Sequence, residues 1–376
     1  MHMRVGVIGG GQLARMLVPA AIELGVEIEV LGEAPGAAAA IAVTSIGAAD
    51  DAQAVLAFAR DKDVVTFDHE HVPQAALQQL VASGVAVRPG PQALAVAQDK
   101  LLLRERMAAL RLPQPVWARV DSADDLTAFI AAVGGRAVVK TPRGGYDGHG
   151  VRVVTAAADV ADWLGAAPLL AEELVPFRRE LAQQVARRPS GGTALNPLVE
   201  TVQRDGVCAE VIAPAPRSAG RVADAAADIA VTIAAALEVT GMLAVELFET
   251  DDERLLINEL AMRPHNSGHW SMDGAVTGQF EQHLRAVLDL PLGSTAPRDD
   301  WSVMVNLLGG PADGDLDARV PGMLAQHPTV KLHRYGKQPR PGRKIGHVTA
   351  SATELDEAVF QARAAAAFFS DPPVQS

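Results

Sequence analysis

The 376-residue chain has one cysteine, few aromatic residues and no long apolar run, and each of these shortages excludes a class of protein. Its single cysteine, Cys208, excludes an intramolecular disulfide and a cysteine-based metal cluster, as is typical of proteins from a reducing cytoplasm. Aromatic residues make up only 4%, so the cores must be aliphatic. No apolar run reaches the roughly 18 residues of a membrane span, and the N-terminus has no signal-peptide pattern. We therefore expect a cytoplasmic protein with no membrane contact.

Basic residues are also in the minority. The chain has 33 Lys and Arg against 45 Asp and Glu, which gives a formal net charge of −12. An acidic surface opposes binding to nucleic acids and anionic membranes, so we expect no nucleic-acid partner. A small phosphorylated ligand is not excluded, because a pocket can be locally basic.

The order of predicted elements indicates an α/β protein with three parts. Strand patterns over residues 4–8 and 26–31 enclose a glycine turn and a helix, which is the βαβ opening of a parallel sheet. This alternation ends near the breaker cluster 89–91, and the longer strands after it look antiparallel. We predict domains over residues 1–97, 98–296 and 297–376.

A glycine loop, Gly9-Gly10-Gly11, lies between the first strand and the first helix. With Ala14 it matches G-x-G-x-x-A, a loop whose backbone amides can meet a phosphate at a helix N-terminus. Glu33 lies near the end of the second strand, where a dinucleotide-binding protein would place an acidic residue. NAD binding and a glycine turn that serves only close packing both remain open.

Two carboxylates interrupt neighbouring apolar strands. Glu246 lies within GMLAVELFET and Glu259 within RLLINELAMRP. Because an unpaired carboxylate in an apolar strand is costly, the pair, with Asn258 beside it, suits one or two Mg²⁺ ions that bridge nucleotide phosphates. For either glutamate alone, a solvent-facing position on an alternating strand is the alternative. The polar run RPHNSGHW that follows at 263–270 adds anion donors and candidate proton carriers.

Two lysines are candidates for phosphate contacts. Lys140 ends the apolar strand RAVVK just before the glycine-rich stretch 144–150, and Lys100 lies in QDKLLLRERM. Either could instead be a surface lysine that extends its amine to water. The acidic run that begins at Glu172 follows a strand, and with Glu180 it could accept hydrogen bonds from adenine and ribose.

The motifs together resemble one known family along nearly the whole chain. They occur in the order GVIGGGQLARM, TFDHEHVP, QDK, VVKTPRGGYDGHG, EELVPFRRE, AVELF, INELAMRPHNSGHW and HRYGKQPRPGRKIGHV. This order resembles the 5-(carboxyamino)imidazole ribonucleotide synthetases, which are ATP-grasp enzymes that carboxylate 5-aminoimidazole ribonucleotide (AIR) in purine synthesis. The resemblance implies an ATP-grasp fold with a Rossmann-like preATP-grasp domain at its N-terminus and a small C-terminal domain.

The resemblance also implies roles for individual residues. Those implied at the ATP site are Lys100, Lys140, Glu172, Glu173, Leu174, Val175, Glu180 and Asn258. Those implied for AIR are Gly11, Gln12, Glu70, Tyr146, Asp147, His149, Lys337, Arg343 and Lys344. The implied catalytic residues are Arg263, His265, Asn266 and Asp147, and Glu246 and Glu259 would hold Mg²⁺ or Mn²⁺.

The implied reaction phosphorylates bicarbonate with ATP and transfers the carboxyl group to the exocyclic amine of AIR. ATP would be a cosubstrate, no biotin is expected, and the family suggests a homodimer. His149 departs from the basic residue that often follows the YDG motif, so substrate affinity would rise as pH falls. The alternatives are a formate-dependent glycinamide ribonucleotide transformylase and a nucleotide-binding regulator without activity.

Overall fold

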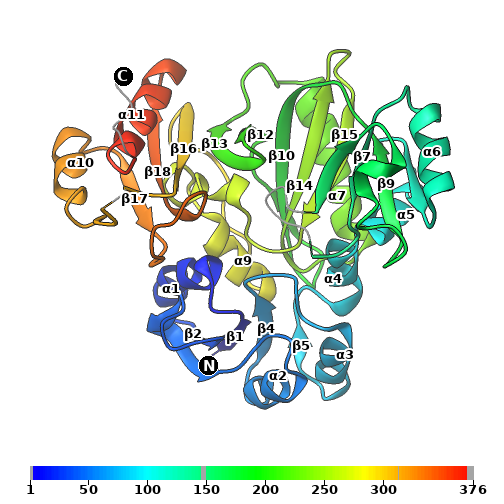
Figure 1. The fold of residues 1–376 in the computed structure, drawn as a ribbon. Coiled ribbons are helices and arrows are strands. Elements are labelled where there is room, and N and C mark those ends of the chain that lie inside the picture. Colours follow the sequence, from blue (N-terminus) through cyan, green and yellow to red (C-terminus); the bar gives the residue numbers. More distant parts are fainter. Residues whose placement is uncertain (1–2, 145–149, 312, 371–376) are drawn as a thin grey trace.

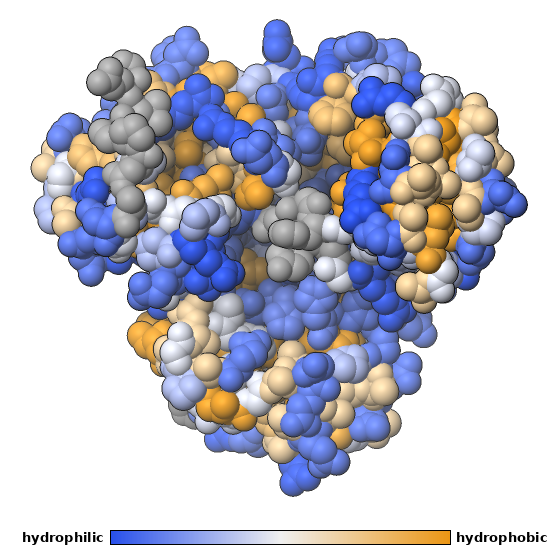
Figure 2. All heavy atoms as spheres, in the orientation of Figure 1, coloured by the Kyte–Doolittle hydropathy of each residue, from blue (hydrophilic) through white to orange (hydrophobic). Residues whose placement is uncertain are grey.

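A computed structural model describes residues 3–144, 150–311 and 313–370. Its strands form three sheets. Figure 1 shows the N-terminal sheet at the bottom and the largest sheet across the upper part of the molecule, with the four-stranded sheet at its right. Hydrophilic residues cover most of the face drawn in Figure 2. In the part of the chain that the structure describes, no helix is long and apolar enough to cross a membrane.

The N-terminal unit is a five-stranded parallel sheet in the order β3-β2-β1-β4-β5. Its central strands are short runs of buried β-branched residues, as a parallel sheet covered on both faces by helices requires. Its strands are β1 (Arg4–Ile8), β2 (Glu27–Gly32), β3 (Val43–Ile46), β4 (Val64–Phe67) and β5 (Ala86–Val87). Its helices are α1 (Gln12–Leu24), α2 (Ala52–Ala59), α3 (Gln74–Ala82) and α4 (Pro91–Gln98), with the 3₁₀ turn η1 (Ala40–Ala42).

A four-stranded antiparallel sheet follows in the order β6-β9-β7-β8. Helix α5 precedes it, and the side chain of Asp99 caps this helix by accepting from the amides of Leu101 and Leu102 at 3.0 and 3.2 Å. The elements of this unit are α5 (Lys100–Ala109), β6 (Trp117–Val120), α6 (Ala123–Ala132), β7 (Ala137–Lys140), β8 (Val151–Val154), η2 (Ala157–Val160) and β9 (Leu169–Glu173).

The largest sheet is antiparallel and has the order β15-β14-β10-β12-β13-β16-β18-β17, with β11 beside β10. Its strands are β10 (Phe177–Arg187), β11 (Thr193–Leu195), β12 (Val199–Arg204), β13 (Val207–Ala213), β14 (Gly241–Thr250), β15 (Leu255–Ala261), β16 (Trp301–Leu308), β17 (Lys331–Arg334) and β18 (Lys344–Ala352). Because β13 pairs with β16, the backbone ladder crosses the predicted domain boundary at residue 297. The C-terminal segment therefore extends the central sheet.

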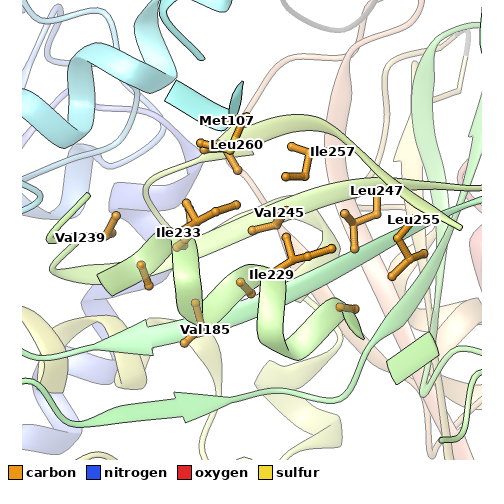
Figure 3. Packing of buried hydrophobic residues seen from close by; sticks show 14 of the residues in the cluster. Met107, Val185, Ile229, Ile233, Val239, Val245, Leu247, Leu255, Ile257 and Leu260 are labelled. Carbon is orange, nitrogen blue, oxygen red and sulfur yellow. The ribbon is translucent and has the colours of Figure 1, made fainter. Parts of the chain in front are cut away.

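Helices cover the largest sheet and connect it to the other units. Helix α7 packs on β10, β14 and β15 through an aliphatic core that includes Ile229, Ile233, Val245 and Leu247, which Figure 3 shows from close by. Such burial is the main stabilising contribution to a core of this kind. The remaining helices are α7 (Arg221–Ala236), η3 (Asn266–Gly268), α8 (Ser271–Gly274), α9 (Gln279–Val287), α10 (Val320–Gln326) and α11 (Leu355–Ala367).

Helix α9 was not expected from the sequence, and it links the units around the site. Its residues Phe280, Leu284 and Val287 lie in the same core cluster as side chains of β1 and α1. The His283 ring bridges two units, because its Nε2 lies 2.8 Å from Thr66 Oγ1 on β4 and its Nδ1 accepts from the Met242 amide on β14 at 3.1 Å. The helix therefore connects the N-terminal sheet to the largest one.

Candidate active site

The predicted carboxylate pair lies on the largest sheet. Glu246 on β14 and Glu259 on β15 are register partners across the antiparallel ladder, as the sequence indicated. Burial, together with the negative charges of Glu259 and Glu180, raises the pKa of Glu246 to about 8. The positive charges of Lys344 and Arg263 lower this pKa, but they do not outweigh burial and the two neighbouring carboxylates.

The opposite side of the site is an ion-pair network. Glu172 on β9 lies 2.7 Å, Oε2 to Nζ, from Lys140 at the end of β7, and its other oxygen accepts from Arg104 Nε. Lys140 Nζ also contacts Asn258 Oδ1 at 3.3 Å, which joins the four-stranded sheet to β15. Although burial alone would raise the pKa of Glu172, the charges of Lys140 and Arg104 hold it below its ordinary value.

This network changes the interpretation of Glu172. Sequence resemblance gave its carboxylate to adenine, but both carboxylate oxygens are committed to cations and the side chain is almost fully buried. A contact between this carboxylate and adenine would have to use a remaining lone pair of an oxygen that a cation already holds, so the adenine role of Glu172 stays a prediction. In the neighbouring backbone, the Val175 carbonyl accepts from the Phe177 amide at 3.0 Å.

Arg104 is a site residue that the motif comparison missed. It is completely buried on α5, and besides Glu172 it donates to the backbone oxygens of Ile257 at 2.7 Å and Asn258 at 2.9 Å. Its guanidinium thus binds a strand of each sheet at once. A single arginine among the charged residues of QDKLLLRERM carries no pattern that would have distinguished it from a solvent-exposed residue.

Several predicted ATP-site residues surround one pocket between the sheets. Lys100, which opens α5, is held through its amide by the Pro142 carbonyl at 2.9 Å. The Glu173 side chain accepts from the Val116 amide at 2.9 Å, and burial raises the pKa of Glu180. The lining of this pocket consists of Lys100, Leu103, Arg104, Lys140, Leu170, Glu172, Asn258 and Glu259.

The polar run after β15 folds over the acidic pair. Arg263 Nε donates to Glu70 Oε2 at 2.8 Å, which connects this run to the N-terminal unit. His265 Nε2 lies 3.3 Å from Glu246 Oε1, and its Nδ1 lies 2.9 Å from Ser267 Oγ. Burial, with the charges of Arg263 and Lys344, lowers the pKa of His265 to about 3. Its imidazole is therefore neutral near pH 7.

Asn266 lies beside His265 and is largely buried. Its Oδ1 accepts from Asn306 Nδ2 at 3.0 Å, whereas its own Nδ2 has no hydrogen-bond partner in the described structure. Glu70 Oε1 is likewise buried and unpartnered among the described atoms. The contact of these two residues with substrate stays a prediction.

The glycine loop packs closely against the carboxylate of Asp68. Asp68, at the end of β4, accepts from the Ala14 amide at 2.7 Å, in the first turn of α1. A Cβ atom at Gly11 would lie 1.9 Å from Asp68 Oδ2, so the glycine is required for this close approach. The Ala14 amide is thus taken by a side chain of the protein and is not available to a dinucleotide pyrophosphate. The NAD interpretation of this loop is disfavoured.

The C-terminal motif meets the glycine loop. Lys337 Nζ donates to Gln12 Oε1 at 2.6 Å, which joins residues 325 positions apart. Arg343 lies on the same loop and donates to the Gln338 carbonyl at 3.2 Å. Lys344 begins β18, and its charge opposes the raised pKa of Glu246. Tyr146, Asp147 and His149 lie outside the described residues.

The acidic pair fits a divalent cation. Oxygen ligands are those that Mg²⁺ prefers, and a cation would relieve the repulsion that raises the pKa of Glu246. Within the described ranges, no group of three or more His, Cys, Asp or Glu residues is arranged to hold a metal by itself. Nucleotide phosphates and water would therefore complete the coordination.

Two antiparallel sheets that face each other across lysines and paired carboxylates define an ATP-grasp enzyme, and family models agree. The ATP-grasp domain matches residues 105–280, and the ribonucleotide synthetase preATP-grasp domain matches residues 2–98. The phosphoribosylaminoimidazole carboxylase C-terminal domain matches residues 302–361.

Relatives that match along nearly the whole chain show which ATP-grasp family it belongs to. The N5-carboxyaminoimidazole ribonucleotide synthase of Mycobacterium bovis is 48% identical, covering 97% of this chain and 87% of its own. That of Corynebacterium ammoniagenes is 45% identical, covering 97% and 91%. The chain belongs to the N5-carboxyaminoimidazole ribonucleotide synthase family.

Solved structures agree with this family. The synthetase from Thermus thermophilus has a TM-score of 0.88 at 37% identity, over 99% of this chain and 100% of that one. The Aspergillus clavatus enzyme, solved with ADP and AIR, has a TM-score of 0.87 at 31% identity, over 96% of each chain. The expected ATP-grasp fold with its preATP-grasp and C-terminal domains is confirmed.

Proposed function

We propose that this protein carboxylates the exocyclic amine of AIR with ATP and bicarbonate, releasing ADP and phosphate, as a step of purine biosynthesis. The observation that carries the proposal is the juxtaposition of Lys140 and Asn258 with the Glu246–Glu259 pair in a chain of this family. The relatives' names and the AIR complex of the Aspergillus enzyme support the substrate.

In the first step, an oxygen of bicarbonate attacks the γ-phosphorus of ATP. A new phosphorus–oxygen bond forms, the bond to ADP breaks, and carboxyphosphate results. Lys100 and Lys140 would neutralise charge on the transferring group, which is the main requirement of such a transfer. Lys140 is suited to this task because Glu172 and Asn258 hold its amine in place.

Glu246 and Glu259, with Asn258 beside them, would hold Mg²⁺ or Mn²⁺. The bound ion would supply positive charge to the phosphate oxygens and orient them. Glu259 lines the same pocket as the two lysines, which supports a shared role at the phosphates.

In the second step, the AIR amine attacks the carboxyl carbon of carboxyphosphate, and phosphate leaves as the amine loses a proton. Arg263 and Asn266 would hold the anionic intermediate. His265 is a neutral hydrogen-bonding group, because burial lowers its pKa to about 3, and this suits it to position the intermediate better than to act as a strong base. Asp147 remains the other proposed proton acceptor.

For AIR, we propose a site where the glycine loop meets the C-terminal motif. Lys337 and Arg343 would bind its phosphate, and the contact between Lys337 and Gln12 supports that placement. Glu70, anchored by Arg263, would face the imidazole or ribose. From the resemblance to the family we also propose a cytoplasmic homodimer, and sedimentation would test its oligomeric state.

The decisive experiment measures ADP release by purified protein with ATP, Mg²⁺ and bicarbonate. We expect AIR to stimulate release and the product to be the carboxyamino ribonucleotide. Stimulation by glycinamide ribonucleotide and formate, but not by AIR, would instead support the transformylase. Binding of ATP without turnover under either condition would support a regulator.

A further inference from the structure

A buried glutamine holds the residue that approaches the acidic pair. Gln279 is the first residue of α9 and is completely buried. Its Oε1 accepts from the His265 amide at 2.9 Å, and its Nε2 donates to the His265 carbonyl at 2.9 Å. One side chain thus binds both main-chain polar groups of one residue.

The other half of the Gln279 amide is used as well. Its Oε1 also accepts from Gln184 Nε2 at 3.1 Å, and its Nε2 lies 2.7 Å from His269 Nδ1. Both amide hydrogens and both oxygen lone pairs therefore have partners. A fully satisfied buried amide has one favoured orientation, because any rotation leaves polar groups unpaired.

The loop around the Gln279 amide is held by further hydrogen bonds and by close packing. The Gln279 amide nitrogen donates to Ser271 Oγ at 2.9 Å, and that hydroxyl donates to the Gly268 carbonyl at 2.6 Å. A Cβ atom at Gly268 would lie 2.2 Å from Gln184 Oε1 and 2.5 Å from Gln279 Oε1. The loop between His265 and Ser271 is therefore tied to α9 at several points.

We propose that Gln279 is a positioning residue of the carboxylation reaction: it fixes the main chain of His265 and thereby the approach of its imidazole to Glu246. The inference rests on the proposed function. Gln279 itself lies behind the loop, and it acts through His265. Since catalytic groups displaced by about 1 Å can lose on the order of 10²-fold in rate, release of this loop should be costly to turnover.

The same helix supplies a matched control. Gln282 is also completely buried, and it also binds both main-chain groups of one residue, donating to the Gly293 carbonyl at 2.7 Å and accepting from the Gly293 amide at 2.8 Å. Gly293 lies in the connection that follows α9, outside the proposed catalytic machinery. Substitution of either glutamine by methionine removes a two-bond clamp on one residue's main chain at similar volume, and Gln279→Met also removes the contacts to Gln184 and His269.

The experiment compares Gln279→Met with Gln282→Met in full-length protein, using AIR-dependent ADP release and thermal unfolding. We expect Gln279→Met to lower kcat about 100-fold, with the KM values for ATP and AIR within about twofold of wild type. Gln282→Met should also lose thermal stability, though less than Gln279→Met because fewer hydrogen bonds are removed, and it should keep kcat within about threefold. Equal kcat values for the two variants, or a large rise in the KM for ATP in Gln279→Met, would overturn the proposal.

A milder variant guards against failure to fold. Gln279→Asn keeps the amide but shortens its reach by one methylene, so it should reproduce the fall in kcat with a smaller change in stability. Wild-type kcat in a folded Gln279→Asn protein would also contradict the proposal. If wild-type protein showed no AIR-stimulated release, the proposed function would fail first, and this result is distinct from equal kcat values in the two methionine variants.

Discussion

The two sides of the inter-sheet site stabilise opposite protonation states of a strand carboxyl group. On the four-stranded sheet, Glu172 is paired with Arg104 and Lys140, and their charges keep its pKa below the ordinary value despite burial. On the largest sheet, burial and the charges of Glu259 and Glu180 raise the pKa of Glu246 to about 8. Both glutamates lie in strands of a well-packed core.

In one part of the site the protein itself supplies the counter-charge of the carboxylate, and in the other part a ligand has to supply it. The Glu172 network has its counter-charges built in, so its role is to orient Lys140 and the strand that carries Asn258. On the Glu246 side the ionised carboxylate is disfavoured until a cation is bound, so this side is suited to a cation that arrives with the nucleotide. A strongly shifted pKa of this kind is typical of functional sites.

The largest expected effect comes from removing charge on the acidic side. Glu259→Gln should lower AIR-dependent ADP release by about 10³-fold or more, because it removes a proposed metal ligand without changing side-chain volume. Thermal unfolding should show a folded protein of equal or higher stability, since like-charge repulsion falls. Activity near that of wild type would remove this glutamate from the metal site.

A control for that variant lies at the hairpin joining the same strands. Glu253 is exposed and pairs with Arg221 at the surface. Exposed pairs contribute little to stability, so Glu253→Gln should leave turnover unchanged.

The next effect comes from breaking the paired side. Arg104→Met should destabilise the protein by about 3–5 kcal/mol, because it leaves Glu172 undercompensated and two backbone carbonyls without their donor. Arg104→Lys keeps a charge near Glu172 but cannot make all three contacts, so its loss should be smaller. Urea unfolding measures both, and equal stability of Arg104→Met and wild type would show that the network is not structural.

The smallest effect is on the pH dependence of stability, which has opposite signs for Glu246 and Glu172. Because the pKa of Glu246 rises from its ordinary 4.5 to about 8 on folding, its protonated form contributes stability at acidic pH that is lost as pH rises toward 8. The cost should be about 1.4 kcal/mol per pH unit at most. Glu172 has a lowered pKa, so its contribution is present above 4.5 and lost as pH falls below that value.

Urea midpoints of metal-free protein across this pH range would measure these slopes. Subtracting the Glu246→Gln curve from the wild-type curve should give a stability difference that falls toward pH 8. The corresponding Glu172→Gln difference should fall toward acidic pH. Slopes of the same sign would contradict the comparison.

The fold and the main features of the site follow from local sequence. The βαβ opening, the hairpin that joins Glu246 to Glu259 and the lysine at the end of β7 depend on neighbouring residues, so periodicity and motif order were sufficient. The family itself was predicted from eight motifs and is confirmed by relatives across the chain.

Residues that act over long sequence distances could not be predicted in this way. Arg104 contacts a carboxylate 68 positions away and a carbonyl 153 positions away. Asp68 accepts from an amide of α1 that lies 54 positions away. Gln279 begins α9 and accepts from Gln184 on the largest sheet. Each looks like an ordinary polar residue until tertiary packing supplies its partner.

The account is tested most directly by the effect of Mg²⁺ on ATP affinity in wild type and in a Glu246→Gln, Glu259→Gln double variant, measured by calorimetry. We predict that Mg²⁺ tightens ATP binding at least about tenfold in wild type and by less than about twofold in the double variant, which lacks the acidic side of the site. An equal gain in both proteins would contradict the assignment of this pair as the part of the site that a cation completes.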